Sequence, residues 1–151
     1  MNINLLQTDS DNADFRALVA LLDADLKIRD GAEHSFYAQF NKTDKIRHAV
    51  VAYQNEKAVG CGAFKEYEPG VAEIKRMYVR EEMRGRGIAG MILADLENWA
   101  KELDFSECIL ETGVKQPEAI GLYKKHGYQI MPSYGQYLNV ENSVCLQKSI
   151  Q

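Results

Sequence analysis

The spacing of hydrophobic residues in the first third of the chain predicts one strand and two helices. Residues 3–8 form a short apolar run that is typical of a strand. Residues 11–31 follow with a helical pattern, in which Asp11 or Asn12 can cap the first turn and Gly31 can end the helix. One face of this helix carries the apolar residues Phe15, Leu18, Val19, Leu22 and Leu26. A shorter helix is predicted over residues 32–41.

The remaining pattern predicts a sheet with helices on both of its faces. Residues 48–79 are expected to form three antiparallel strands, with turns at 54–57 and 67–70. A long helix then runs to about Leu103, and strand 107–112, helix 116–127, strand 128–131 and strand 143–150 follow. This order favours an α/β (α+β) fold with a mixed sheet. The length favours a single domain over residues 1–151.

The third strand of the 48–79 segment contains a change of phase. Ala72 and Ile74 are apolar in one step of the alternation, whereas Met77 and Val79 are apolar in the opposite step. One extra residue near Lys75–Arg76 would return all four side chains to one face, which is the pattern of a β-bulge. Such a bulge would bend the strand away from strand 107–112. The alternative is a strand that is buried on both faces, in which case the phase carries no information.

Composition and charge exclude several classes of protein. The net charge of −4 argues against a general nucleic-acid binder. No apolar run approaches the ~20 residues of a membrane-spanning helix, and the first residues do not resemble a secretion signal. The three cysteines are far apart and form no C-x-x-C pair, so neither a metal site nor a disulfide framework is expected. Buried cysteines in a reducing cytoplasm are the natural interpretation.

The stretch MYVREEMRGRGIAG, residues 77–90, combines glycines and arginines at the start of the long helix. The string GRGIAG matches the dinucleotide fingerprint G-x-G-x-x-G, but five residues separate it from the preceding strand, and the preceding strands are joined by hairpins. A second interpretation is a solvated turn. The third is an anion site, because glycines and a helix N-terminus can present several N–H groups to one ligand. The positive charges of Arg84 and Arg86 interact unfavourably with the dipole at the helix N-terminus. An anion bound between the two arginines would offset this cost.

At this point the sequence resembles the GNAT N-acetyltransferase superfamily. Arg84, Gly87 and Ala89 match its Q/R-x-x-G-x-G/A motif, EIKRMYV precedes the motif, and LYKKHGY follows the long helix. The resemblance covers residues 50–131 well, and the order of elements matches over nearly the whole chain. It implies the acyl-CoA N-acyltransferase fold, with a mostly antiparallel sheet splayed at a bulged strand. It also implies acetyl-CoA as cosubstrate.

The resemblance implies a set of coenzyme contacts. The backbone of strand residues 77–79 should pair with the pantetheine arm and the acetyl carbonyl, and the amides of the glycine turn should hold the pyrophosphate. Many relatives place an Asn after the next strand, where this chain offers Gln116. The expected coenzyme-binding residues are Met77, Tyr78, Val79, Arg84, Gly85, Arg86, Gly87, Ile88, Ala89, Gln116 and Tyr123.

Acetyl transfer to an amine needs a base, because a lysine-like ammonium has a pKa of ~10.4, and it benefits from an acid at the departing thiolate. Tyr123 resembles the tyrosine of the family's L-Y-x-x-x-G-F/Y motif and is the expected acid. The alternative is an aromatic ring that packs against the sheet. Glu73 is the expected base. The alternative for Glu73 is a surface ion pair with Lys65. The alternatives for the base are Glu111 and an ordered water.

The acceptor side is expected to include His34 and, in the loop before the last strand, Tyr134, Tyr137 and Glu141, with Glu111 nearby. Aromatic and acidic side chains suit a cationic amine. The predicted function is therefore direct transfer from acetyl-CoA to a small-molecule or peptide primary amine in a ternary complex. A non-catalytic acyl-CoA-binding sensor is the main alternative. The sequence specifies neither the acceptor nor an oligomeric interface, although homodimers are common in the family.

Overall fold

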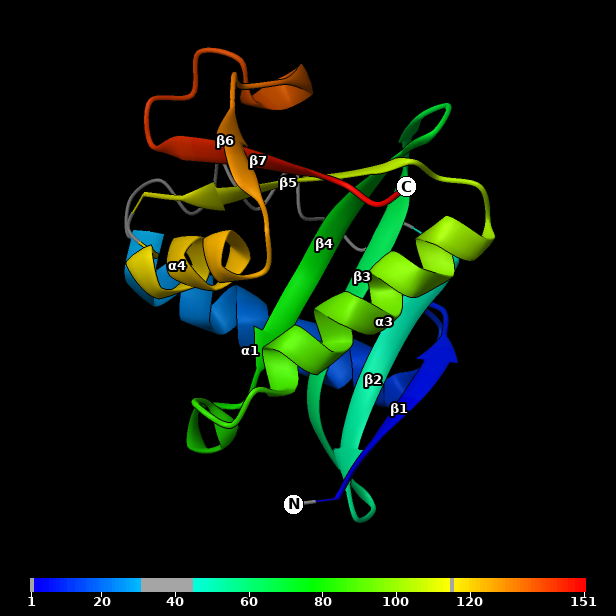
Figure 1. The fold of residues 1–151 in the computed structure, drawn as a ribbon. Coiled ribbons are helices and arrows are strands. Elements are labelled where there is room, and N and C mark those ends of the chain that lie inside the picture. The colour runs from blue at the N-terminus through cyan, green and yellow to red at the C-terminus, as the bar shows by residue number, and fades with distance from the viewer. Residues whose placement is uncertain (1, 31–44, 115) are drawn as a thin grey trace.

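A computed structural model describes residues 2–30, 45–114 and 116–151, and the strands in these ranges form one sheet with the order β1-β2-β3-β4-β5-β7-β6 (Figure 1). The strand positions agree with the predicted ones to within one residue at most ends. The predicted helix over residues 32–41 lies outside the described residues. The strands are β1 Ile3–Thr8, β2 His48–Gln54, β3 Lys57–Glu68, β4 Val71–Val79, β5 Glu107–Gly113, β6 Gln129–Met131 and β7 Ser143–Ser149.

Three α-helices lie in the described ranges, α1 Ala13–Asp30, α3 Ile88–Glu102 and α4 Pro117–Lys125, together with the short 3₁₀ helices η2 Glu81–Met83 and η3 Gly135–Tyr137. Asn12 caps α1, since its Oδ1 accepts a hydrogen bond of 2.9 Å from the Phe15 N–H. Figure 1 shows α3 and α4 in front of the sheet and α1 behind it. The prediction of helices on both faces is confirmed.

The sheet divides between β4 and β5. Neighbouring strands are antiparallel except for β4 and β5, which are parallel. The parallel pairing joins only Val71–Glu73 to Glu107–Ile109, while β5 continues along β7 as far as Gly113. Beyond Glu73 the two strands therefore separate, as Figure 1 also shows. The expected mostly antiparallel, splayed sheet is confirmed.

A β-bulge in β4 accompanies this separation. Ala63 of β3 lies opposite Lys75 and Cys61 lies opposite Tyr78, so two residues of β4, Arg76 and Met77, oppose Gly62 alone. Arg76 has a φ of 61°, in the left-handed region that non-glycine residues rarely adopt. Its carbonyl accepts a hydrogen bond of 3.3 Å from the Cys61 thiol. The bulge predicted near Lys75 is confirmed.

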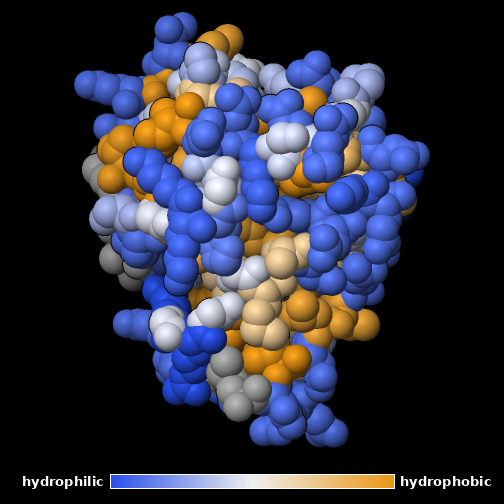
Figure 2. All heavy atoms as spheres, viewed as in Figure 1, coloured by the Kyte–Doolittle hydropathy of each residue, from blue (hydrophilic) through white to orange (hydrophobic). Residues whose placement is uncertain are grey.

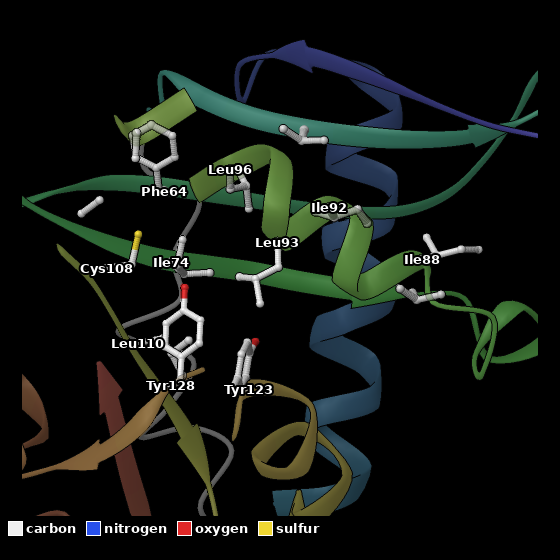
Figure 3. Close-up of a cluster of buried hydrophobic side chains, with 14 of the residues drawn as sticks. Phe64, Ile74, Ile88, Ile92, Leu93, Leu96, Cys108, Leu110, Tyr123 and Tyr128 are labelled. Atoms are coloured by element: carbon white, nitrogen blue, oxygen red, sulfur yellow. The ribbon is translucent and has the colours of Figure 1, made fainter. Parts of the chain in front are cut away.

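The bulge keeps one face of β4 apolar along its length. Ala72, Ile74 and Val79 are buried in the main core, and Met77 packs against it from a partly buried position. Figure 3 shows this core between α3 and the sheet. The molecular face that carries α3 and α4 is mainly hydrophilic, with small hydrophobic patches (Figure 2). A second core lies under α1, so Glu73 and Lys75 project from β4 toward the α1 side of the sheet.

Substitution of Gly62 tests how tightly α3 packs over the bulge. A Cβ at this position would overlap the Met77 sulfur and would lie 2.9 Å from both Ile92 and Leu96. We therefore expect Gly62→Ala to lower the free energy of unfolding by about 1–3 kcal/mol through overpacking. Urea denaturation measures this change. Gly121→Ala is the matched control, because a Cβ there meets no atom within 4 Å; an equal effect of the two substitutions would contradict the packing described.

Candidate active site

A cavity of about 120 Å³ occupies the place where β4 and β5 separate. Its walls come from α1, from β4 around the bulge, from the end of β5, from the start of α4 and from η3. The lining residues are Leu22, Leu26, Glu73, Ile74, Lys75, Arg76, Met77, Glu111, Thr112, Gly113, Gln116, Ala119, Tyr123 and Tyr137. Because both faces of the sheet contribute residues, the cavity connects the α4 side with the α1 side.

A buried ion pair lies on the β4 wall. Lys75 Nζ is 3.7 Å from Glu73 Oε1, and the two side chains are only 7% and 3% exposed. Residues two apart on a strand project to the same face, which is why β4 can present both groups to one cavity. Burial lowers the pKa of Lys75; Glu73 and Glu111 act in the opposite direction, and Lys65 and Arg76 reinforce the lowering.

The loop before β7 supplies a second partner for Glu73. The Tyr134 hydroxyl donates a hydrogen bond of 2.9 Å to Glu73 Oε2, and both residues are buried. The Tyr134 ring contacts Tyr67 and Tyr137 edge to face, with centroids 5.1 Å and 5.5 Å away. Burial raises the pKa of Tyr134, and Glu73 raises it further, so this hydroxyl stays protonated. The carboxylate of Glu73 is thus held between a phenol and an ammonium group.

The opposite wall carries Glu111 and Gln116. Glu111 Oε2 accepts a hydrogen bond of 2.8 Å from the Ser143 hydroxyl of β7. Gln116 occupies the N-cap position of α4, immediately before Pro117, and its N–H donates to the Gly113 carbonyl over 3.0 Å. Glu73 and Glu111 therefore face one cavity from the two strands that separate.

Tyr123 lies on α4, where the cavity meets the main core. It is buried, and its ring packs against Tyr128 with a centroid distance of 5.7 Å (Figure 3). Burial raises the pKa of Tyr123, and Glu111 raises it further, so its hydroxyl stays protonated throughout the neutral range. Tyr128 has a structural role instead: its hydroxyl donates to Glu97 Oε2 over 2.8 Å, and Lys148 holds the other oxygen of that carboxylate.

The glycine turn connects β4 to α3 and leaves amides exposed. Gly85 and Gly87 have φ values of 80° and 82°, and Gly87 is the N-cap of α3 without a side-chain capping hydrogen bond. The N–H groups of a helix's first turn have no intrahelical acceptor, and they add partial positive charge. A Cβ at either glycine would meet nothing within 4 Å, so the space beside this turn is open.

The arginines of the turn are used in different ways. Arg84 Nε donates to the Val79 carbonyl over 2.9 Å, Nη2 lies 3.6 Å from Asp25 of α1, and the guanidinium lies 5.4 Å from the Tyr78 ring centroid. Its side chain therefore fixes the turn against β4 and α1. Arg86 is exposed. The role of either guanidinium group beside an anion stays a prediction.

The structure brings several predicted site residues into the cavity and leaves others apart. Glu73, Met77, Glu111, Gln116, Tyr123 and Tyr137 line it. Tyr134 does not line the cavity, but its hydroxyl donates a hydrogen bond to Glu73, which does. Glu141 is exposed and does not line the cavity, so the role of Glu141 at the acceptor stays a prediction. His34 lies outside the described residues. Sequence reasoning missed Lys75 and Arg76, although their position at the predicted bulge and the i, i+2 spacing of Lys75 from Glu73 were visible signals.

Cysteine chemistry does not contribute to this site. All three cysteines are buried, and burial raises the pKa of Cys61 and Cys108 to about 12, so their thiols stay protonated. Within the described residues no group of three His, Cys, Asp or Glu side chains is arranged to hold a metal ion. None of the helices in those ranges is long and apolar enough to cross a membrane.

Comparisons with known proteins agree with this geometry. The chain is 38% identical over 89 residues to an IAA acetyltransferase of Azospirillum brasilense, covering 58% of each chain. It is 26% identical over 130 residues to acetyltransferase Atu2258 of Agrobacterium fabrum, covering 86% of this chain and 93% of the relative. For several of its relatives the matched region spans only about half of the relative's length, for example 56% and 53%.

Solved structures share the whole fold. A protein from Klebsiella pneumoniae assigned as an acyl-CoA N-acyltransferase superimposes with a TM-score of 0.83 at 29% identity, over 99% of this chain and 98% of that one. The PaiA N-acetyltransferase of Thermoplasma acidophilum, solved with coenzyme A, has a TM-score of 0.73 at 17% identity over 99% of both chains. The sequence model of the Acetyltransferase (GNAT) family matches residues 15–128, and the chain belongs to this family.

Proposed function

We propose that the protein transfers an acetyl group from acetyl-CoA directly to a primary amine in a ternary complex. The observation that carries this proposal is the single cavity at the division of the sheet, in which a protonated tyrosine and two carboxylates face one space. Amine acylation benefits from an acid and a base in one space, because a proton must leave the amine and another must reach the departing thiolate. Membership of the GNAT family supports the acetyl chemistry.

The coenzyme would extend from the glycine turn into the cavity. The amides from Gly85 to Ala89 would hold its diphosphate, since the N-terminus of α3 and two left-handed glycines present N–H groups to open space. The Arg84 N–H, which was expected to contribute, donates instead to the Glu81 carbonyl over 3.3 Å. The β4 residues Met77, Tyr78 and Val79 lead from the cavity to this turn and have no ladder partner on β5. Their backbone groups are therefore placed to pair with the pantetheine arm.

Two residues would move protons in the reaction. Glu73 would accept the proton of the acceptor ammonium, and the nitrogen would then attack the thioester carbonyl. Tyr123 would donate its proton to the departing thiolate, and burial keeps its hydroxyl protonated before the reaction. Glu111 and Tyr137, on the opposite wall, would contact the acceptor cation through charge and ring face.

A screen of primary amines tests the proposal. Purified protein is mixed with acetyl-CoA and each amine, and the release of coenzyme A thiol is measured. We expect release with at least one amine and formation of its N-acetyl derivative by mass spectrometry. Binding of acetyl-CoA without transfer to any amine would favour the sensor, and absence of binding would reject both functions.

Tyr134 is expected to position Glu73 rather than to contact the reacting atoms. Tyr134→Phe removes the hydrogen bond to Glu73 Oε2, and bonds to charged groups contribute about 1.5–3 kcal/mol, so kcat should fall about tenfold or more. Tyr67→Phe is the control, because Tyr67 contacts the Tyr134 ring without reaching Glu73. An unchanged kcat in Tyr134→Phe, or a fall of the same size in Tyr67→Phe, would contradict this role.

A further inference from the structure

We propose that Lys75 is a self-acetylation site, at which the protein modifies its own cavity when no acceptor amine is bound. The inference rests on the proposed acetyl-CoA-dependent function. It starts from a lysine side chain that lines the cavity and is only 7% exposed. A buried lysine is a primary amine already held where the acceptor amine has to be placed.

The pairing of Lys75 with Glu73 reproduces the pairing that amine transfer requires. Nζ lies 3.7 Å from Glu73 Oε1, so the group proposed to take a proton from the acceptor is beside the proton of this ammonium. Glu73 is in turn fixed by the Tyr134 hydroxyl at 2.9 Å. Burial lowers the pKa of Lys75, which increases the fraction of uncharged amine above that of an exposed lysine.

The distances along β4 place Lys75 within reach of the acetyl group. Lys75 is two residues before Met77, where the pantetheine arm is expected to begin its pairing, and two strand residues span about 7 Å. Tyr123 and Lys75 line the same cavity of about 120 Å³ from opposite faces of the sheet. A thioester that reached Tyr123 would therefore lie within the space that Nζ also borders.

The chemical step balances with groups that the site already holds. Glu73 takes a proton from the Lys75 ammonium, an N–C bond forms between Nζ and the acetyl carbon, and the C–S bond breaks. The second proton that Nζ must lose passes to solvent, and so does the proton held by Glu73. Tyr123 donates a proton to the departing thiolate and regains one from solvent. The products are N-acetyl-Lys75, coenzyme A and one released proton. The modified side chain would lose its charge, break the pair with Glu73 and occupy part of the cavity, so the reaction would inhibit further transfer.

Intact-protein mass spectrometry and peptide mapping test the inference. The full chain is incubated with acetyl-CoA and no acceptor, and acetylation of Lys75 is compared with that of Lys57, whose side chain is 61% exposed. We expect Lys75 to be acetylated faster than Lys57 in folded protein, at a rate that falls about 10²-fold in Tyr123→Phe. In urea-unfolded protein the two rates should become similar. Lys75→Arg, which keeps the positive charge, should abolish the fast modification.

The outcomes separate this inference from the proposed function. If calorimetry shows acetyl-CoA binding and an amine is acetylated, but Lys75 reacts no faster than Lys57, the self-acetylation inference is wrong and the function stands. A Lys75 rate that is the same in folded and unfolded protein would also overturn it, because it would indicate uncatalysed acylation. If acetyl-CoA does not bind, the proposed function fails and the inference fails with it.

Discussion

Replacing Tyr123 by phenylalanine is expected to lower kcat for acetyl transfer about 10²-fold or more, with the Kd for acetyl-CoA unchanged. The substitution removes one hydroxyl at the border of the cavity and keeps the ring that packs against Tyr128. The departing thiolate would then have to take its proton from water. Steady-state kinetics and calorimetry with acetyl-CoA measure the two quantities separately.

Tyr128→Phe is the matched control for this result. Its hydroxyl binds Glu97 away from the cavity, so the substitution should lower stability by about 1.5–3 kcal/mol and leave kcat within about twofold. Equal kcat for Tyr123→Phe and the unmodified protein would contradict the acid role, and Tyr123 would then be a packing residue of the core. A sensor would show intact coenzyme binding and no transfer in either protein.

Replacing Glu73 by glutamine should have an effect of similar size. The amide cannot accept a proton from the acceptor ammonium, so kcat/KM is expected to fall about 10²-fold or more at neutral pH. Glu111→Gln is the comparison that decides between the two carboxylates, because both line the cavity. A severe loss in Glu111→Gln with a mild one in Glu73→Gln would assign the base to Glu111, and mild losses in both would favour water.

The ion pair with Lys75 complicates the single substitution at Glu73. Removing one partner of a buried pair leaves an uncompensated charge and can cost about 3–5 kcal/mol. The double variant Glu73→Gln, Lys75→Met removes both charges and should recover most of the lost stability in thermal unfolding. If it recovers stability but not activity, the catalytic loss belongs to Glu73 itself.

Local sequence patterns were sufficient to predict the scaffold of the site. The change of phase between Ile74 and Met77 predicted the bulge, because strand alternation is a property of adjacent residues. The glycines of the turn likewise indicated a backbone with unusual freedom, and Gly85 and Gly87 adopt left-handed φ values in the structure. The choice between Asp11 and Asn12 as helix cap needed the structure, since both have suitable side chains.

The electrostatics of the site depend on tertiary contacts that local patterns do not encode. Tyr134 reaches Glu73 across 61 residues of sequence, which changes its expected role from acceptor contact to support of a carboxylate. The pairing of Arg84 with Asp25 depends on where α1 lies behind the sheet. The sequence pattern identifies Lys75 only as a bulge position, because its burial depends on the packing of α1 and of the loop before β7.

The placement of the coenzyme diphosphate on the amides of residues 85–89 is tested most directly by calorimetric titration of acetyl-CoA into the unmodified protein and Gly87→Val. Valine at a φ of 82° costs at least about 1–2 kcal/mol, so the turn should relax and the Kd should rise about tenfold or more. Gly121→Ala, on the exposed surface of α4, should bind as the unmodified protein does. Failure of the unmodified protein to bind, or an unchanged Kd in Gly87→Val, would contradict the account.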